Sequence, residues 1–318
     1  MKLIKNAKSA FWVALPPAFL WVLFFMALPT AAGDKSLVLY FPKPAIGRYC
    51  IIRTATDPMD DTFVRPDAWA TGKITVPPGC MIHLTLNYNG GQNTKFLRTL
   101  PPGTLRGLIC RDMEVDDKAI ADMCTQKGLV ILNLQGVDLT DEGAKHLSPL
   151  KDLRKLSICD TLVSPKGLAV LRNMPLLHNL NLSRLALGEA VDKPLEPLKN
   201  LFLLELTGTQ LTDKAVIELP SFPKLQSLVL RRNNLTDKCI DSLLKYRTLR
   251  SLDLTDTNVT IEGLKRLKAL PKLRHVTVRM KDIKIADRSQ LKKLMPRLEI
   301  HDGSREQVVP TELFAPLH

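Results

Sequence analysis

Leucine recurs at a fixed interval over most of the chain. From Leu105 a leucine occupies every 24th position as far as Leu273, and one more, Leu298, follows one residue late. Further aliphatic positions come three and five residues after the first, as Leu204 and Leu206 do after Leu201. A fixed period of this length indicates supersecondary units stacked into a solenoid, because one such unit cannot bury its hydrophobic face alone. The recurring leucines are Leu105, Leu129, Leu153, Leu177, Leu201, Leu225, Leu249 and Leu273.

A helix-start pattern follows the leucines in most units. A residue able to cap a helix comes eleven positions after the first leucine in six of eight units: Asp116, Thr140, Ser164, Thr212, Thr236 and Thr260. An acid often follows, as Asp141 follows Thr140, and its charge complements the positive end of the helix dipole. Later apolar positions then face inward from that helix. The pattern predicts an α/β solenoid, a horseshoe with parallel strands on its concave face and short helices on its convex face.

Two units depart from this pattern. The fourth has Gly188 at the capping position and Asp192 where an apolar residue is expected. The eighth has Lys284 and Arg288 at the same two positions. We therefore expect irregular outer helices in these units and fraying near the end of the array.

The chain divides into four segments by pattern. Residues 33–104 lack the period and contain β-prone runs at 36–41, 48–53, 72–76 and 81–88, separated by turn residues. They predict a small β-rich cap that covers the first repeat. Eight to nine repeats follow over 105–300, and residues 301–318 form a C-terminal tail.

Residues 1–32 read as a leader. Lys2, Lys5 and Lys8 precede an uncharged stretch from Phe11 to Ala32. A basic start, an apolar middle and small residues at the end are typical of a secretory signal peptide. The same uncharged stretch is long enough for an uncleaved membrane anchor. Under either interpretation we expect the rest of the chain to be exported to the periplasm, the cell surface or the medium.

Positive charge is concentrated near the end of the array. The whole chain carries a formal net charge of +13, and residues 264–297 contain twelve Lys or Arg against Asp282 and Asp287. This stretch is either a solvated outer face or an attachment site for an anionic surface. It contains no aromatic residue on which bases could stack, so a nucleic-acid partner is not expected.

The outer segments carry a family resemblance. Residues 139–143 (LTDEG) and 259–264 (VTIEGL) resemble bacterial leucine-rich-repeat proteins with a TDxGL-type outer segment, relatives of the cysteine-containing repeat class. The resemblance covers about residues 105–300. The strand at 47–53 followed by residues 72–79 resembles the β segment that precedes such arrays in secreted planctomycete-type proteins. The resemblance implies a curved scaffold that binds macromolecules and brings no shared catalytic residues.

Strand residues between the leucines are expected to face the concave surface. A mostly polar row and two arginines near the far end form the candidate binding face: Asn133, Ser157, Asn181, Glu205, Asp253, Arg231 and Arg279. Parallel strands about 4.8 Å apart would set these side chains side by side. Such a ladder suits a protein, an extended peptide or a glycan, although it could also be an ordinary hydrated face.

No catalytic, cofactor or metal site is predicted. His178 and His275 lie four repeats apart and cannot pair, and the common catalytic and metal-binding motifs are missing from the sequence. Asp57, Asp60 and Asp61 lack the glycine turn and terminal glutamate of a calcium loop. Cys50 and Cys80 flank predicted strands of the cap, and export would permit a disulfide between them, with two unpaired thiols as the alternative.

Two functional hypotheses follow. The first is a non-enzymatic, exported or membrane-anchored scaffold that binds its partner on the concave face. The second is a structural component of the cell envelope, held to an anionic surface by the basic final repeats.

Overall fold

The computed structural model describes residues 35–54, 62–279 and 284–303. The leader, the acidic loop with Asp57, Asp60 and Asp61, and tail residues 304–318 lie outside these ranges. Within the described ranges, none of the helices combines the length and apolar character needed to cross a membrane.

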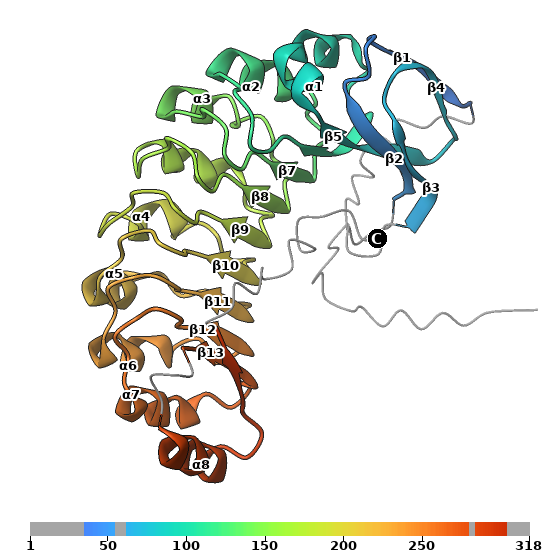
Figure 1. The fold of residues 1–318 in the computed structure, drawn as a ribbon. Helices are drawn as coiled ribbons and strands as arrows, with labels where there is room; N and C mark the ends of the chain where they lie inside the picture. The colour runs from blue at the N-terminus through green and yellow to red at the C-terminus, as the bar shows by residue number, and fades with distance from the viewer. Residues whose placement is uncertain (1–34, 55–61, 280–283, 304–318) are drawn as a thin grey trace, which may run out of the picture. The chain divides into compact units, whose positions relative to one another are not determined.

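The repeats form a solenoid with one strand in each unit. The strands are β6 (Leu105–Ile109), β7 (Ile131–Asn133), β8 (Lys155–Ser157), β9 (Asn179–Asn181), β10 (Leu203–Glu205), β11 (Ser227–Val229), β12 (Ser251–Asp253), β13 (His275–Val278) and β14 (Glu299–Asp302). They pair in parallel and in sequence order, and each residue lies opposite the residue 24 positions later, as Leu204 lies opposite Leu228. In Figure 1 these strands line the inner face of an arc and the helices line its outer face. The predicted leucine-rich-repeat fold is confirmed.

Short helices cover the outer face. The 3-10 helices among the described residues are η2 (Thr94–Thr99), η3 (Gly167–Asn173), η4 (Asp237–Cys239) and η5 (Leu267–Ala269). The α-helices are α1 (Tyr88–Gln92), α2 (Asp117–Met123), α3 (Asp141–Lys145), α4 (Asp192–Leu195), α5 (Asp213–Glu218), α6 (Ile240–Leu243), α7 (Ile261–Arg266) and α8 (Ile285–Leu294). Predicted caps form at several of them; the Thr140 hydroxyl, for example, accepts a hydrogen bond from the Glu142 amide at 3.2 Å.

The leucines of each unit meet those of the next in a continuous core. Leu201, Leu204 and Leu206 are fully buried, as are their counterparts Leu225, Leu228 and Leu230 one repeat later. One cluster of buried apolar side chains runs from Leu39 to Leu298. Each fully buried leucine contributes about 1.5–3 kcal/mol relative to an exposed one, so the stacking of layers is the main stabilising interaction.

The strands β6 to β12 each lead into a turn that requires a left-handed backbone. The residue seven positions after the first leucine has a positive φ, between 54° and 63°, in seven consecutive units: Asp112, Gly136, Asp160, Arg184, Gly208, Arg232 and Asp256. Glycine adopts this conformation freely and aspartate tolerates it better than most residues. Next to this position, the buried Asn233 side chain bridges two units, because it accepts from the Thr209 amide (3.1 Å) and donates to the Leu206 carbonyl (2.7 Å).

The acid after the cap connects neighbouring units. The Asp141 carboxylate accepts hydrogen bonds from the Ser164 amide (2.7 Å) and hydroxyl (2.6 Å) in the following repeat. Asp117, Asp213 and Asp237 bind Thr140, Thr236 and Thr260 in the same way. The dipole argument from sequence missed this contact. It also explains a glycine of the TDxG phrase: a Cβ on Gly143 would lie 1.9 Å from Asp117 Oδ1.

Strands before the repeats extend the same sheet. β5 (Cys80–Leu86) pairs in parallel with β6, β2 (Gly47–Arg53) pairs antiparallel with β5, and β3 (Thr62–Trp69) lies at the edge. β1 (Leu37–Phe41) and β4 (Gly72–Val76) form a separate antiparallel pair. The four β-prone runs are therefore strands. β3 was not predicted, since Pro66 and Asp67 interrupt its β pattern.

The eighth unit differs from expectation in its helix. An irregular outer helix was expected there, but α8 spans ten residues and is the longest described helix. The strand that follows the late Leu298 keeps the register, because Glu299 lies opposite His275, 24 residues earlier. Arg288 does not enter the core, and Leu291 is the only fully buried residue of α8. In the fourth unit the expectation holds, since α4 has four residues and no side-chain cap.

A charge placed in the core should unfold the array cooperatively. Leu206→Asp puts a carboxylate among fully buried leucines and should cost about 4 kcal/mol or more, because neither the cavity nor the charge can be compensated. Ile217→Asp, at a side chain that is 49% exposed on α5, is the control and should cost less than about 1 kcal/mol. Denaturant unfolding followed by circular dichroism measures both. Equal effects would contradict the assigned register.

Asp141 and its neighbour Glu142 provide a matched test of the connection between units. Asp141→Ala removes the acceptor of two hydrogen bonds from Ser164 and should lower the free energy of unfolding by about 1–2 kcal/mol. Glu142→Ala makes the same charge change but removes only an exposed ion pair with Lys145, which contributes about 0.3–0.5 kcal/mol. Chemical denaturation compares the two variants, and a loss for Asp141→Ala no larger than that for Glu142→Ala would refute the inter-repeat role.

Candidate functional site

The concave face consists of three rows of side chains that alternate with the buried leucines. The first, central and third rows lie two, four and six residues after the first leucine of each unit, as Leu203, Glu205 and Thr207 do after Leu201. The central row runs straight across the sheet through cross-strand neighbours, and the structure brings the predicted polar residues together in it. Its members from β7 to β14 are Asn133, Ser157, Asn181, Glu205, Val229, Asp253, Thr277 and His301. Arg231 and Arg279 lie just beyond the strand ends, in the third row. Neighbouring members are about 4.8 Å apart, as is usual for paired strands.

Three members of the central row bind their own backbone. The side-chain oxygens of Asn133, Asn181 and Asp253 each accept a hydrogen bond from the amide two residues later, at 3.1, 2.9 and 2.8 Å. Asparagine and aspartate form this local bond readily, and it helps end the strand. These residues therefore have a structural role that the sequence reasoning did not anticipate. Asn133, Ser157 and Asp253 are buried, whereas Asn181 and Glu205 are partly exposed.

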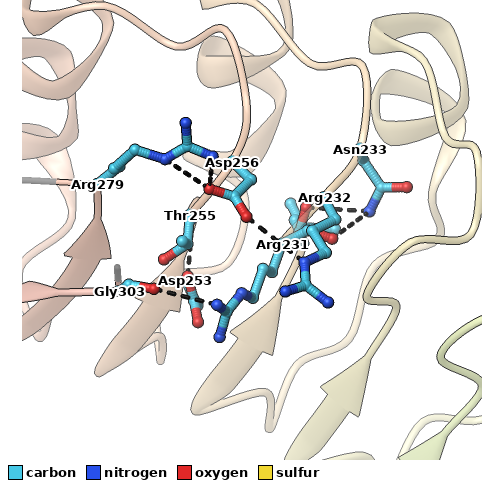
Figure 2. A network of polar contacts seen from close by, with 9 residues as sticks. Arg231, Arg232, Asn233, Asp253, Thr255, Asp256, Arg279 and Gly303 are labelled. Atoms are coloured by element: carbon cyan, nitrogen blue, oxygen red, sulfur yellow. Dashed lines mark hydrogen bonds and ion pairs between the residues drawn. The ribbon is translucent and has the colours of Figure 1, made fainter. Parts of the chain in front are cut away.

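Both predicted arginines are held by partners within the chain (Figure 2). Arg279 forms an ion pair with Asp256, and its Nε lies 2.7 Å from the Asp256 carboxylate. Arg232, in the turn after β11, lies 3.5 Å from the other oxygen of that carboxylate. These pairings lower the pKa of Asp256, although its partial burial opposes the effect. The Arg231 guanidinium donates to the Gly303 carbonyl at 3.0 Å.

The contact between the Arg231 guanidinium and the Gly303 carbonyl depends on close approach of the backbone at Gly303. A Cβ there would lie 1.9 Å from the Thr255 hydroxyl oxygen, so only glycine fits without a shift. The arginine cluster thus connects the strand ends of the last units to one another. It is a structural network more than a free cationic surface.

Glu205 is an acidic group of the inner face whose pKa lies far from its ordinary value. It lies between Asn181 and Val229, and Val229 and the nearby Leu203 are buried apolar side chains. Burial raises the pKa of the Glu205 carboxyl to about 7. Near neutral pH this side chain can therefore act as both a hydrogen-bond donor and an acceptor.

The hypothesis of a Cys50–Cys80 disulfide is wrong in this structure, in which both thiols are free. Cys50 lies opposite His83 and Cys80 lies opposite Arg53, three residues away along the strand pair. That offset is about 10 Å and puts the two side chains on opposite faces of the sheet. Disulfide formation requires Cα atoms closer than about 7 Å, so the strands would have to shift. Burial raises the pKa of Cys50 to about 11, with a contribution from Asp67, which keeps the thiol protonated.

A cluster that the sequence reasoning missed lies at the end of the inner face. His275 on β13 lies opposite Glu299 on β14, and His301 follows two residues later on the same face. His275 Nδ1 is 3.1 Å from His301 Nε2 and 3.3 Å from Glu299 Oε2. His301 and His275 are 26 positions apart, which conceals their proximity in the sequence. Only the 24-residue register, carried through the last strand, could have revealed it.

The basic end combines paired and exposed charges. Lys265 pairs with Glu262, and Arg266 pairs with Asp241, each at 2.7 Å. Further cations on the outer side and the connecting turns are solvent exposed: Lys268, Lys272, Lys284, Lys292, Lys293 and Arg297. Within the described residues, the positive excess of the last repeats is therefore partly available at the surface.

The altered pKa of Glu205 has a measurable consequence. Its folded-state pKa exceeds the ordinary value of 4.5, so the neutral carboxyl adds to the free energy of unfolding at low pH. This contribution is complete below about pH 4.5 and is lost as the pH rises through about 7. The amide of Glu205→Gln cannot ionise, so the variant avoids the cost of burying a carboxylate at high pH. The variant should exceed the wild type in free energy of unfolding by roughly 1–3 kcal/mol near pH 8 and match it near pH 4. Denaturant titrations at both pH values measure the difference, and a gain that does not depend on pH would contradict the assignment.

Comparisons with known proteins add a likeness of fold. No protein-family model matches the sequence, and a search of curated proteins gave no match. Among solved structures, an internalin from Listeria monocytogenes has a TM-score of 0.48 and 19% identity, over 64% of this chain and 56% of its own. A leucine-rich-repeat protein from Leptospira interrogans has a TM-score of 0.46 and 22% identity, over 62% of this chain and 55% of its own.

Internalin C2 from Listeria monocytogenes is also similar, with a TM-score of 0.42 and 21% identity over 61% of this chain and 75% of its own. The chain thus spans little more than half the length of the first two structures. At these identities the likeness concerns the fold alone. The leucine-rich-repeat architecture itself follows from the strand register and the continuous leucine core of this chain.

Proposed function

We propose that this protein is a non-enzymatic leucine-rich-repeat scaffold that binds a protein, peptide or glycan on its concave face. The observation that carries the proposal is the parallel ladder of strands, which repeats side chains at a constant spacing across the inner surface. A rigid, regularly spaced surface suits an extended partner whose own groups repeat at intervals. The family resemblance of the TDxGL-type outer segments supports the same class of function.

Asn181 and Glu205 form the most suitable recognition pair. They lie opposite each other on β9 and β10, and both are partly exposed. Because the Asn181 side-chain oxygen accepts from the Ser183 amide, its NH₂ group is left to donate outward. Glu205 beside it supplies carboxyl oxygens. Adjacent donors and acceptors of this kind match a peptide amide or the hydroxyl groups of a sugar.

Partly exposed polar side chains continue along the inner face beyond this pair. Thr207 on the third row, Ser227 on β11 and Ser251 on β12 lead from Glu205 toward His275. In contrast, Ile131, Asn133, Lys155 and Ser157 at the other end of the array are buried. We therefore assign the contact surface to the repeats from the fourth unit onward.

Export is part of the proposal. It is supported by the basic start, the uncharged stretch and the small residues at the end of residues 1–32. The leader would act either as a cleaved signal peptide or as a membrane anchor. A location in the periplasm, at the cell surface or in the medium would place the partner outside the cytosol.

The exposed cations of the last repeats favour a second candidate function. Lys268, Lys272, Lys292, Lys293 and Arg297 could hold the protein to an anionic surface, so that the array serves as a structural component of the envelope. Attachment of this kind is electrostatic and weakens as salt screens the charges, with a Debye length of about 3 Å at 1 M.

One binding experiment separates the two functions. The immobilised protein captures partners from the envelope fraction of the producing organism at low and at high salt. For concave recognition, the Asn181→Ala/Glu205→Gln variant should lose at least about tenfold in capture, because the outward NH₂ donor of Asn181 is removed and the Glu205 carboxyl becomes a neutral amide that cannot supply a charged acceptor. Binding should largely persist in high salt. Asn258→Ala/Glu196→Gln, at two exposed positions away from the inner rows, is the control and should behave like the wild type.

The opposite result supports envelope attachment. In that case capture disappears in high salt and on charge reversal of Lys268, Lys272, Lys292 and Lys293, while the Asn181/Glu205 variant retains it. Capture that is insensitive to every one of these changes would reject both functions.

A further inference from the structure

The inner face ends in a compact group of three side chains that can ligate a metal ion. His275 Nδ1 and His301 Nε2 are 3.1 Å apart, and Glu299 Oε2 lies 3.3 Å from the former and 3.8 Å from the latter. All three atoms lie within 4.8 Å of one another. No other group of this kind occurs among the described residues.

These separations match the edges of a coordination polyhedron. Metal–nitrogen and metal–oxygen bonds of about 2.0–2.2 Å at tetrahedral angles put ligand atoms about 3.3–3.6 Å apart. The three observed distances, 3.1, 3.3 and 3.8 Å, lie close to that range. An ion at the centre of the triangle would therefore need only small rotations of the three side chains.

The sheet positions these side chains before any ion binds. His275 and Glu299 lie opposite each other on the paired strands β13 and β14, and His301 occupies the next position on the same face. In strands, residues two apart share a face, so the register alone directs all three toward the concave side. Ligands on paired strands are held more precisely than ligands on loops.

The type of donor narrows the choice of ion. Two imidazole nitrogens and one carboxylate oxygen suit zinc and neighbouring transition metals, whereas magnesium and calcium prefer sets of oxygen ligands. We propose that His275, Glu299 and His301 form a binding site for a divalent transition-metal ion, with Zn²⁺ as the reference ion, on the concave face of the last two repeats.

The site would leave part of the coordination sphere open. Zn²⁺ takes at least four ligands and the chain supplies three, so water or a group of a bound partner completes the shell. The side chains of His275, Glu299 and His301 are 44%, 62% and 40% exposed, which gives a partner access. One carboxylate neutralises only part of the charge of a divalent ion. A bound ion would thus attract a carboxylate or another anionic group of a ligand on the inner face.

Without metal, the same atoms form a hydrogen bond. At 3.1 Å one ring donates to the other, with the donor set by the tautomer. Metal binding replaces this bond, because both nitrogens must then present lone pairs to the ion. It would also connect β14, the last strand of the sheet, to β13, so the loaded protein should resist unfolding better than the free protein.

Calorimetric titration of the chelator-treated full chain with ZnCl₂ tests the proposal. We expect one Zn²⁺ per chain and an increase in melting temperature on binding, with no response to Mg²⁺. His275→Ala, His301→Ala and Glu299→Gln should each weaken Zn²⁺ binding by at least about tenfold, since each removes one of three ligands. His146→Gln, at an exposed histidine on the outer side after α3, is the control and should bind Zn²⁺ as the wild type does.

A measurement on the wild type tests the metal site even if the variants fail to fold. Co²⁺ in place of Zn²⁺ should give the visible absorption of a nitrogen- and oxygen-ligated ion, and Zn²⁺ should displace it at one equivalent. The proposal is overturned if the wild type binds no Zn²⁺, or if the three variants bind as tightly as the His146→Gln control. These outcomes do not depend on the partner of the concave face, so they test the metal site separately from the scaffold function.

Discussion

Contact between the leucine layers of adjoining units is the interaction on which the rest of the structure depends. A unit of 24 residues has a three-residue strand, one turn and a helix of a few residues, and it cannot enclose its own apolar side chains. Leu204 is fully buried because Leu180 and Leu228 lie on either side of it. The same core continues into β5 and β2, so the strands before the repeats seal the first layer by extending the sheet.

Polar contacts control the spacing of these layers. On the outer side, an aspartate of one unit accepts two hydrogen bonds from the cap of the next. At the strand end, a left-handed residue turns the chain, and in one unit Asn233 bonds the backbone of two neighbours. These bonds satisfy backbone groups that would otherwise be buried without partners, which is costly. They therefore select one stacking geometry from those that leucine burial alone would permit.

The need to give buried backbone groups hydrogen-bond partners also limits the chemistry available on the inner face. Asn133, Asn181 and Asp253 use their oxygens to end strands, and Arg279 and Arg231 bind Asp256 and the Gly303 carbonyl. A polar residue on a repeat surface is thus often part of the scaffold. The groups with remaining capacity are Glu205, the outward amide of Asn181 and the cluster of His275, Glu299 and His301, all from the fourth unit of the array onward.

The sequence by itself determined the fold, because a leucine period of 24 residues specifies which side chains are buried and which strands are neighbours. It also located the inner-face rows and most strands of the cap. Only the tertiary structure decided what the polar residues do. The Asp141–Ser164 bond, the Arg231–Gly303 contact and the His275–His301 pair join residues 23, 72 and 26 positions apart. Hydrophobic burial leaves a periodic trace along the chain, whereas a hydrogen bond or ligand set depends on side-chain direction and distance, which exist only once the layers have stacked.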